Sequence, residues 1–178
     1  MGYEIPLRVD ANQGWGFEEA IATLKALEPF KLQHCEEPLP RWAFMQLPEI
    51  RRQSPVRIMS DETCGDHNDV QRLIDLEACD LINIKLGKSG GIFKALKMIK
   101  LAEARNIKIQ IGAFLESRIG MTAFAHLALS SDQIIYFDFD TALMFSEDPV
   151  EGGIIYKENG VIEVPEEPGI GARLKNNR

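Results

Sequence analysis

Leu81-Ile82-Asn83-Ile84-Lys85 is a short apolar run that ends at a charged residue, and this design recurs along the chain. It is repeated in Leu7-Arg8-Val9-Asp10, Leu32-Gln33-His34-Cys35-Glu36 and Arg57-Ile58-Met59-Ser60-Asp61. The successive end residues Asp10, Glu36, Asp61 and Lys85 are 26, 25 and 24 residues apart. The interval continues, at 27 and 26 residues, through Lys108-Ile109-Gln110-Ile111-Gly112 and Ile134-Ile135-Tyr136-Phe137-Asp138. A strand, a helix and two loops take about this length, so the sequence predicts repeated β/α units.

Amphipathic stretches fill the intervals between the predicted strands. Apolar residues recur at helical spacing over residues 17–30, 69–77, 92–105 and 121–129, which predicts helices that cover a sheet. The pattern changes after Asp148-Pro149, where two apolar runs flank Glu158-Asn159-Gly160 and predict a hairpin. We therefore expect a partial barrel over residues 1–150 and a C-terminal hairpin and tail over residues 151–178. The part from Pro165 to Arg178 is expected to be irregular, because it is rich in proline, glycine and charge.

The predicted fold is α/β, of the TIM-barrel type, with six of the eight β/α units of a closed barrel. A closed barrel needs eight strands and typically about 250 residues, whereas this sequence supplies six strands in 178 residues. An open six-stranded sheet would expose two apolar edges, which natural proteins avoid. We therefore expect the chain to be the C-terminal part of something larger. We also expect it to associate, as a homo-oligomer or through its open barrel edges.

Composition excludes several classes of function. The chain is 45% hydrophobic and 26% charged, as in an ordinary soluble domain, and its net charge of −7 argues against a nucleic-acid surface. It lacks the apolar stretch of eighteen or more residues that a membrane span requires. Gly87-Lys88-Ser89 is not the end of a P-loop, because Ile82 stands where glycine is needed. Lys88 is instead expected to shape the loop that opens the next helix. Three cysteines without a C-x-x-C pair favour a reducing, cytoplasmic setting.

The strand-end residues are the candidates for chemistry, because the carboxyl ends of barrel strands converge on one mouth. Asp10, Glu36 and Asp61 offer only oxygen ligands, which suit Mg²⁺, or Mn²⁺, rather than Zn²⁺. Any one of them alone is as readily explained by a helix cap or an ion pair. Three acids in phase, followed by Lys85 in phase, favour a metal site with a base. A dication beside Lys85 would lower its pKa, and a metal with a lysine base can remove a proton α to a carboxylate.

Four motifs at this spacing resemble those of the enolase superfamily, muconate-lactonizing subgroup: Asp10-Ala11-Asn12-Gln13-Gly14-Trp15, Glu36-Glu37-Pro38-Leu39, Ser60-Asp61-Glu62-Thr63 and Asn83-Ile84-Lys85-Leu86. The resemblance runs from about Leu7 to Gly171. It implies that Asp10, Glu36 and Asp61 are Mg²⁺ ligands, that Lys85 is one acid/base, and that Asn12 lies near the metal. Sites of this superfamily pair a lysine or histidine base with Mg²⁺. The resemblance also implies an N-terminal capping domain and two further barrel strands, one bearing the opposing lysine, none of which is in this sequence.

The last predicted strand resembles that of the dipeptide epimerases. In that group a D-x-D pair, matched here by Asp138 and Asp140 in Phe137-Asp138-Phe139-Asp140, holds the α-ammonium of an L-Ala-type dipeptide. Residues two apart on a strand share one face, so the two carboxylates suit a cation. The alternative is that one of them pairs with a structural arginine or lysine. Glu116 follows the preceding strand and is a further candidate for substrate binding, with a surface or ion-pair role equally open.

The resemblance therefore implies a Mg²⁺-dependent epimerase of dipeptides that removes the α-proton and passes through a metal-stabilised enediolate. Two alternatives stay open. One is an enzyme like muconate cycloisomerase or o-succinylbenzoate synthase, and the other is a catalytically inactive fragment that binds metal. Inverting a stereocentre needs a group on each face of the enediolate, and this sequence supplies only Lys85. We therefore expect the chain alone to be inactive.

Overall fold

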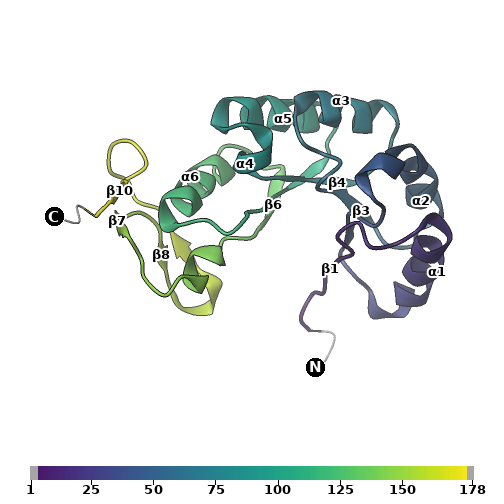
Figure 1. Ribbon diagram of the computed structural model, residues 1–178, viewed down its shortest axis with the longest axis horizontal. Coiled ribbons are helices and arrows are strands. Elements are labelled where there is room, and N and C mark those ends of the chain that lie inside the picture. The colour runs from purple at the N-terminus through teal and green to yellow at the C-terminus, as the bar shows by residue number, and fades with distance from the viewer. Residues whose placement is uncertain (1–3, 176–178) are drawn as a thin grey trace.

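Six parallel strands form the centre of the protein in a computed structural model, which describes residues 4–175 (Figure 1). They are β1 (Val9–Asp10), β2 (Cys35–Glu36), β3 (Ile58–Ser60), β4 (Leu81–Ile84), β5 (Lys108–Ile111) and β6 (Ile134–Phe137). Their order in the sheet is their order in the chain, and each neighbouring pair is parallel. The predicted α/β fold with six β/α units is therefore confirmed, and the strands form an open half-barrel.

The predicted helices are all present: α1 (Phe17–Leu27), α3 (His67–Asp75), α5 (Ile92–Ala104) and α6 (Arg118–Ala128). Figure 1 shows α1, α3 and α5 along the outer side of the sheet. Helix α3 begins two residues earlier than expected, because the carboxylate of Asp66 caps it by accepting the backbone N–H groups of Asn68 and Asp69. Helix α5 ends at Ala104, one residue before the predicted end, and Asn106, two residues on, has a left-handed φ of 53°.

Several short helices were not predicted. They are the 3₁₀ helices η2 (Arg41–Gln46), η3 (Thr141–Met144) and η4 (Glu158–Gly160), and the α-helices α2 (Leu47–Gln53) and α4 (Leu86–Ser89). The 3₁₀ helix η1 (Glu28–Phe30) is instead the last part of the helix predicted over residues 17–30. Helix α2 buries only Leu47 and Ile50, and η2 buries only Ala43. Elements with so few buried residues carry no apolar stripe long enough to give a helical period. Helix α4 corrects the expected loop at Lys88, since this residue lies within the helix.

The central strands β2 to β5 are buried on both faces, which explains their continuous apolar sequence. Every residue of β3 and β4 is buried, with helices on one side and the interior of the half-barrel on the other. The outermost strand β6 differs, because Ile135 and Phe137 are 39% and 49% exposed. Within residues 4–175, β1 and β6 each pair with a strand on one side only. The half-barrel therefore presents two open edges, as the strand count predicts.

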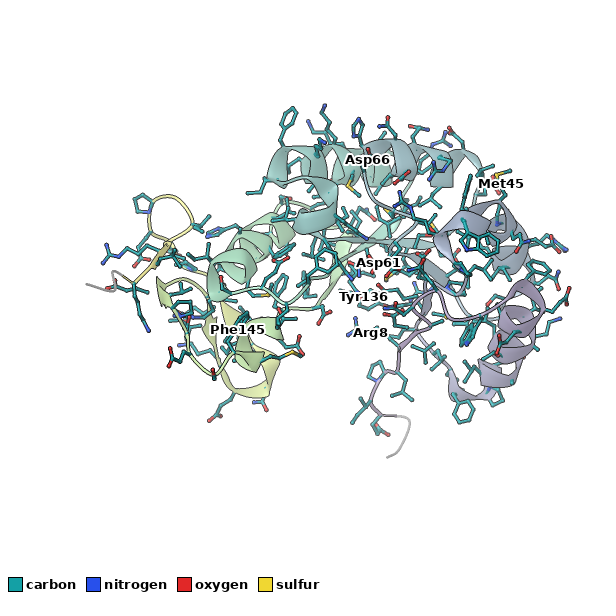
Figure 2. All side chains as sticks on the ribbon, in the orientation of Figure 1. Arg8, Met45, Asp61, Asp66, Tyr136 and Phe145 are labelled. Carbon is teal, nitrogen blue, oxygen red and sulfur yellow. The ribbon has the colours of Figure 1, made fainter. Side chains whose placement is uncertain are left out.

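A polar layer crosses the inside of the half-barrel and shows how strongly the sheet curves. Arg8, next to β1, donates to Gln110 of β5 at 3.0 Å, and its guanidinium carbon lies 5.2 Å from the ring centroid of Tyr136 in β6. Arg57 donates to the Tyr136 hydroxyl at 3.1 Å. In Figure 2, Arg8 and Tyr136 lie on the side of the sheet opposite α3 and α5. The first and last strands are therefore linked across the interior by side chains.

The C-terminal segment contains two small antiparallel pairs. Strands β8 (Ile155–Tyr156) and β9 (Ile162–Glu163) form the predicted hairpin, with Asn159 at a left-handed φ of 58° in its turn. The expectation of an irregular end is wrong for β10 (Ala172–Leu174), which pairs with β7 (Val150–Gly152). This pairing joins segments about twenty residues apart, so no local pattern reveals it. Residues 176–178 lie outside the described part of the chain.

Arg118, the first residue of α6, holds this segment against the half-barrel. Its guanidinium donates to the carbonyl oxygens of Gly152 at 2.7 Å, Val150 at 2.8 Å and Ile154 at 3.1 Å, and to Asp148 at 2.5 Å. Replacing it would leave several acceptors without their charged donor.

We predict that Arg118→Met lowers the free energy of unfolding by about 2–4 kcal/mol, because unmet acceptors of charged hydrogen bonds carry a desolvation cost. Urea unfolding measures this loss. The matched control is Arg173→Met, since the side chain of Arg173 is 76% exposed and pairs with the equally accessible Glu151. An unfolding midpoint for Arg118→Met equal to that of Arg173→Met would contradict the prediction.

Candidate active site

The four residues that the sequence selects lie at the carboxyl ends of adjacent strands. Asp10 and Glu36 end β1 and β2 and stand opposite one another in the register of that pair. Asp61 and Lys85 directly follow the last residues of β3 and β4. The strand-end placement is therefore as predicted, and it brings the four side chains to one end of the half-barrel.

Glu36 is buried and held by two amides. Its Oε1 accepts Asn83 Nδ2 at 2.7 Å and its Oε2 accepts Gln110 Nε2 at 3.2 Å. Burial raises the pKa of Glu36 to about 7; the hydrogen bond from Asn83 opposes this, and the charges of Asp61 and Asp10 add to it. Three carboxylates thus repel one another at this point, and a cation bound among them would relieve that repulsion.

Asp61 accepts hydrogen bonds from two lysine side chains. Lys85 Nζ lies 2.7 Å from Oδ2, and Lys88 Nζ contacts Oδ1 and also the backbone oxygen of Asp61 at 2.5 Å. Burial acts to lower the pKa of Lys85, but the hydrogen bond and charge of Asp61 outweigh it, so the net pKa is raised. The lowered pKa expected beside a dication stays a prediction. Lys88 is a functional neighbour that sequence reasoning missed, although it lies one helical turn after Lys85.

Glu37 fixes the loop that carries Asp61. It is 1% exposed, and its carboxylate accepts the backbone N–H of Asp61 at 2.6 Å and the hydroxyl of Thr63. Burial raises the pKa of Glu37, and these two hydrogen bonds oppose that rise. Strand alternation does not reveal this role, because β2 ends at Glu36 and Glu37 turns out of the strand with a left-handed φ of 33°.

Asp10 is exposed, and its carboxylate accepts hydrogen bonds from the turn that follows β1. Its Oδ1 accepts the backbone N–H of Asn12 at 2.8 Å, and its Oδ2 lies 3.5 Å from Asn12 Nδ2. Asn12 and Gln13 have left-handed φ values of 45° and 65°, which turn the chain sharply after β1. Asn12 therefore contacts a candidate ligand, and its place beside a metal stays a prediction.

The donor set fits a hard dication in chemistry and charge, because Asp10, Glu36 and Asp61 supply only carboxylate oxygens. Their present side-chain positions do not form a finished site. Within residues 4–175, no group of three or more acidic, histidine or cysteine side chains is arranged to hold a metal ion. Both oxygens of Asp61 are engaged by lysines. Metal binding would require Asp61 to exchange at least one of these contacts, so the role of the three acids as ligands stays a prediction.

Asp138 reaches the same interior as the strand-end acids. A cavity of about 220 Å³ is lined by Asp138 together with Arg8, Val9, Asp10, His34, Glu36 and Gln110. Burial raises the pKa of Asp138, Asp140 raises it further, and Arg8 and Lys85 oppose the rise. Strand β6 ends at Phe137, so Asp138 and Asp140 lie just beyond it rather than within it. Asp140 is nevertheless close enough for its charge to raise the pKa of Asp138.

Glu116 lies between α4 and α6 rather than among the strand-end acids. An added Cβ on Gly120 of α6 would stand 2.8 Å from Glu116 Oε2, and one on Gly87 of α4 would stand 3.8 Å from Oε1. Burial raises the pKa of Glu116. Its role in substrate binding stays a prediction.

The fold agrees with that of the protein's relatives. Residues 1–178 match the family model described as enolase C-terminal domain-like, and the chain belongs to that family. It is 55% identical over 171 residues to a D-Ala-D/L-Ala epimerase of Cytophaga hutchinsonii, covering 96% of this chain and 46% of the relative. The chain thus spans about half the length of the curated relatives it matches.

Two solved structures share the fold closely. One is the dipeptide epimerase from Cytophaga hutchinsonii, complexed with Mg and the dipeptide D-Ala-L-Val. It has a TM-score of 0.97 and 53% identity, with 99% of this chain and 48% of that chain covered. The other is a substrate-liganded complex of the L-Ala-D/L-Glu epimerase from Bacillus subtilis, with a TM-score of 0.93 and 35% identity over 96% and 48% of the two chains.

Proposed function

We propose that this chain forms the C-terminal half of the active-site barrel of a Mg²⁺-dependent dipeptide epimerase. The observation that carries the proposal is the contact of Lys85 with Asp61 at 2.7 Å, beside the buried Glu36. In this contact an amine lies next to carboxylate oxygens at the carboxyl end of the sheet, which supports a base beside a metal site. The likeness to epimerases of dipeptides, one of them solved with Mg and a dipeptide, supports the same reaction class.

Asp10, Glu36 and Asp61 would hold the ion. Mg²⁺ bound there supplies a fixed positive charge, which stabilises the charge that develops on a substrate carboxylate when its α-proton leaves. Lys85 would then leave Asp61 and take or return the proton at the substrate Cα on one face. Asp138 and Asp140, the ammonium clamp, would bind the substrate's free amino group. The acid/base for the other face is expected in the part of the relatives that this chain does not match.

A catalytically inactive metal-binding fragment is the second candidate for the chain by itself, and its coverage of only 46% of a relative favours it. A cycloisomerase-like reaction is the alternative for the complete protein.

Within residues 4–175 no helix combines the length and hydrophobicity that a membrane crossing requires. The three cysteines are free and buried, which supports the proposal of a reducing, cytoplasmic location.

The metal site is tested by titrating the chain with Mg²⁺ and Mn²⁺ in a calorimeter. We predict that Asp61→Asn weakens binding by about 100-fold or more, since losing even an outer partner of a metal ligand costs roughly 10–100-fold. The matched control is Asp132→Asn, because Asp132 is an exposed residue of the turn before β6. Equal affinities for Asp61→Asn and Asp132→Asn would refute the metal site.

A further inference from the structure

The orientation of Glu36 depends on amide side chains from β4 and β5. Asn83 of β4 is 1% exposed and Gln110 of β5 is 5% exposed, and each donates to a different oxygen of Glu36. Buried amides without hydrogen bonds are costly, so both residues need this contact. Each carboxylate oxygen keeps a further lone pair. Glu36 also lines the same cavity as Asp10 and Asp138. The two amides therefore hold its carboxylate toward Asp10, another candidate ligand.

Gly112, directly after β5, provides the space in which the Asn83 amide lies. A Cβ added to Gly112 would stand 2.6 Å from Asn83 Oδ1, 2.7 Å from Nδ2 and 3.0 Å from Cγ. Gly112 is not among the described glycines with positive φ, so its backbone conformation does not require glycine. The reason for glycine here is the space that the amide occupies.

One end of the Asn83 amide accounts for its buried position. Its Oδ1 is buried and has no hydrogen-bond partner in the described part of the chain, so the acceptor end does not hold the amide in place. The donor end does, through the 2.7 Å contact with Glu36. Burying Oδ1 without a hydrogen bond costs free energy, and the same buried position allows Nδ2 to orient Glu36.

We propose that Asn83, packed against Gly112, is a positioning residue that fixes Glu36 for the metal ion. Gly112 thereby controls metal affinity without touching the ion. This inference rests on the proposed function, because it assigns the residues that support one ligand of the proposed site. Partners that orient metal ligands act in this way generally, and their loss typically costs about 10–100-fold in affinity.

The test is a double-substitution cycle read by Mn²⁺ affinity, measured by electron paramagnetic resonance on the chain itself. Gly112→Ala is expected to weaken Mn²⁺ binding by about 10–100-fold by displacing the amide, and Asn83→Ala by a similar factor. The variant that carries both changes should bind no more weakly than Asn83→Ala alone, because the new methyl group then fills the space that the amide has left. Purely structural damage from two substitutions would instead accumulate.

Gly16→Ala is the matched control. An added Cβ there meets nothing within 4 Å among the described residues, and φ is −77°. It should bind Mn²⁺ as the unaltered chain does, and thermal unfolding of each variant shows that it is folded at the titration temperature. Unchanged binding by folded Gly112→Ala, or multiplying losses in the double variant, would overturn this inference alone. Absence of Mn²⁺ binding by the unaltered chain would overturn the proposed function and the inference together.

Discussion

Replacement of Lys85 by alanine is expected to abolish exchange of the substrate α-proton with solvent deuterium on one face. The assay requires a form of the protein that also carries the half of the barrel found in its relatives. General acid–base groups contribute about 10²–10⁴-fold to rate, so a loss of at least this size is expected. Lys85 is poised for the reaction by its contact with Asp61 at 2.7 Å and its position 5.2 Å from the Phe114 ring centroid.

Exchange is measured by NMR in D₂O on each epimer of an L-Ala-L-X dipeptide. The matched control is Lys97→Ala, because Lys97 lies on the outer surface of α5 over Phe93. It should exchange both epimers at the normal rate. Normal exchange of both epimers by Lys85→Ala would remove Lys85 from the mechanism.

The ammonium clamp is expected to give the other large effect. Dipeptides with a free amino group should react, and their N-acetylated forms should be at least about 100-fold poorer in kcat/KM, since a carboxylate that the bound substrate desolvates without pairing costs several kcal/mol. Burial and Asp140 raise the pKa of Asp138. On acidification the clamp therefore loses charge at a higher pH than an isolated aspartate would, and KM for the free dipeptide should rise as the pH falls.

Asp138→Asn tests the assignment, because it should remove most of the discrimination between free and acetylated peptides. Asp132→Asn, an exposed change, should preserve it. Equal turnover of free and acetylated peptides by the unaltered protein would refute the clamp. It would favour an acid substrate like those of the cycloisomerases.

The sequence predicted the first four strands because each is an apolar run that ends at a charged residue. Burial on both faces makes the runs continuous, and the β/α repeat makes their spacing regular, so Asp10 to Lys85 could be aligned without coordinates. The sequence could not predict the pairing of β10 with β7. Nor could it predict the hydrogen bonds from Arg118 to three backbone carbonyl oxygens, since backbone acceptors have no sequence signature. The tail therefore looked irregular.

The supporting residues of the site were missed for a related reason. Asn83 and Gly112 carry no distinctive sequence signal until the packing of β4 against β5 places one against the other, and Asn83 against Glu36. Lys88 looked like part of a loop, because a helix as short as α4 has no apolar period to reveal it. Periodicity reports which side of an element is buried, but it does not report which polar atoms meet there.

The strands lie in the sheet in the same order as in the chain, and this order has a consequence for folding during synthesis. Each strand pairs with the strand that precedes it by about one β/α unit, so most native pairings join segments that leave the ribosome close together in time. Contacts of short sequence separation form quickly, and domains commonly acquire structure from the N-terminal side during synthesis. The side-chain links across the interior, such as that from Arg8 to Gln110, which are 102 residues apart, must wait. Growth of the sheet can therefore proceed by addition at one edge, with the polar layer closing last.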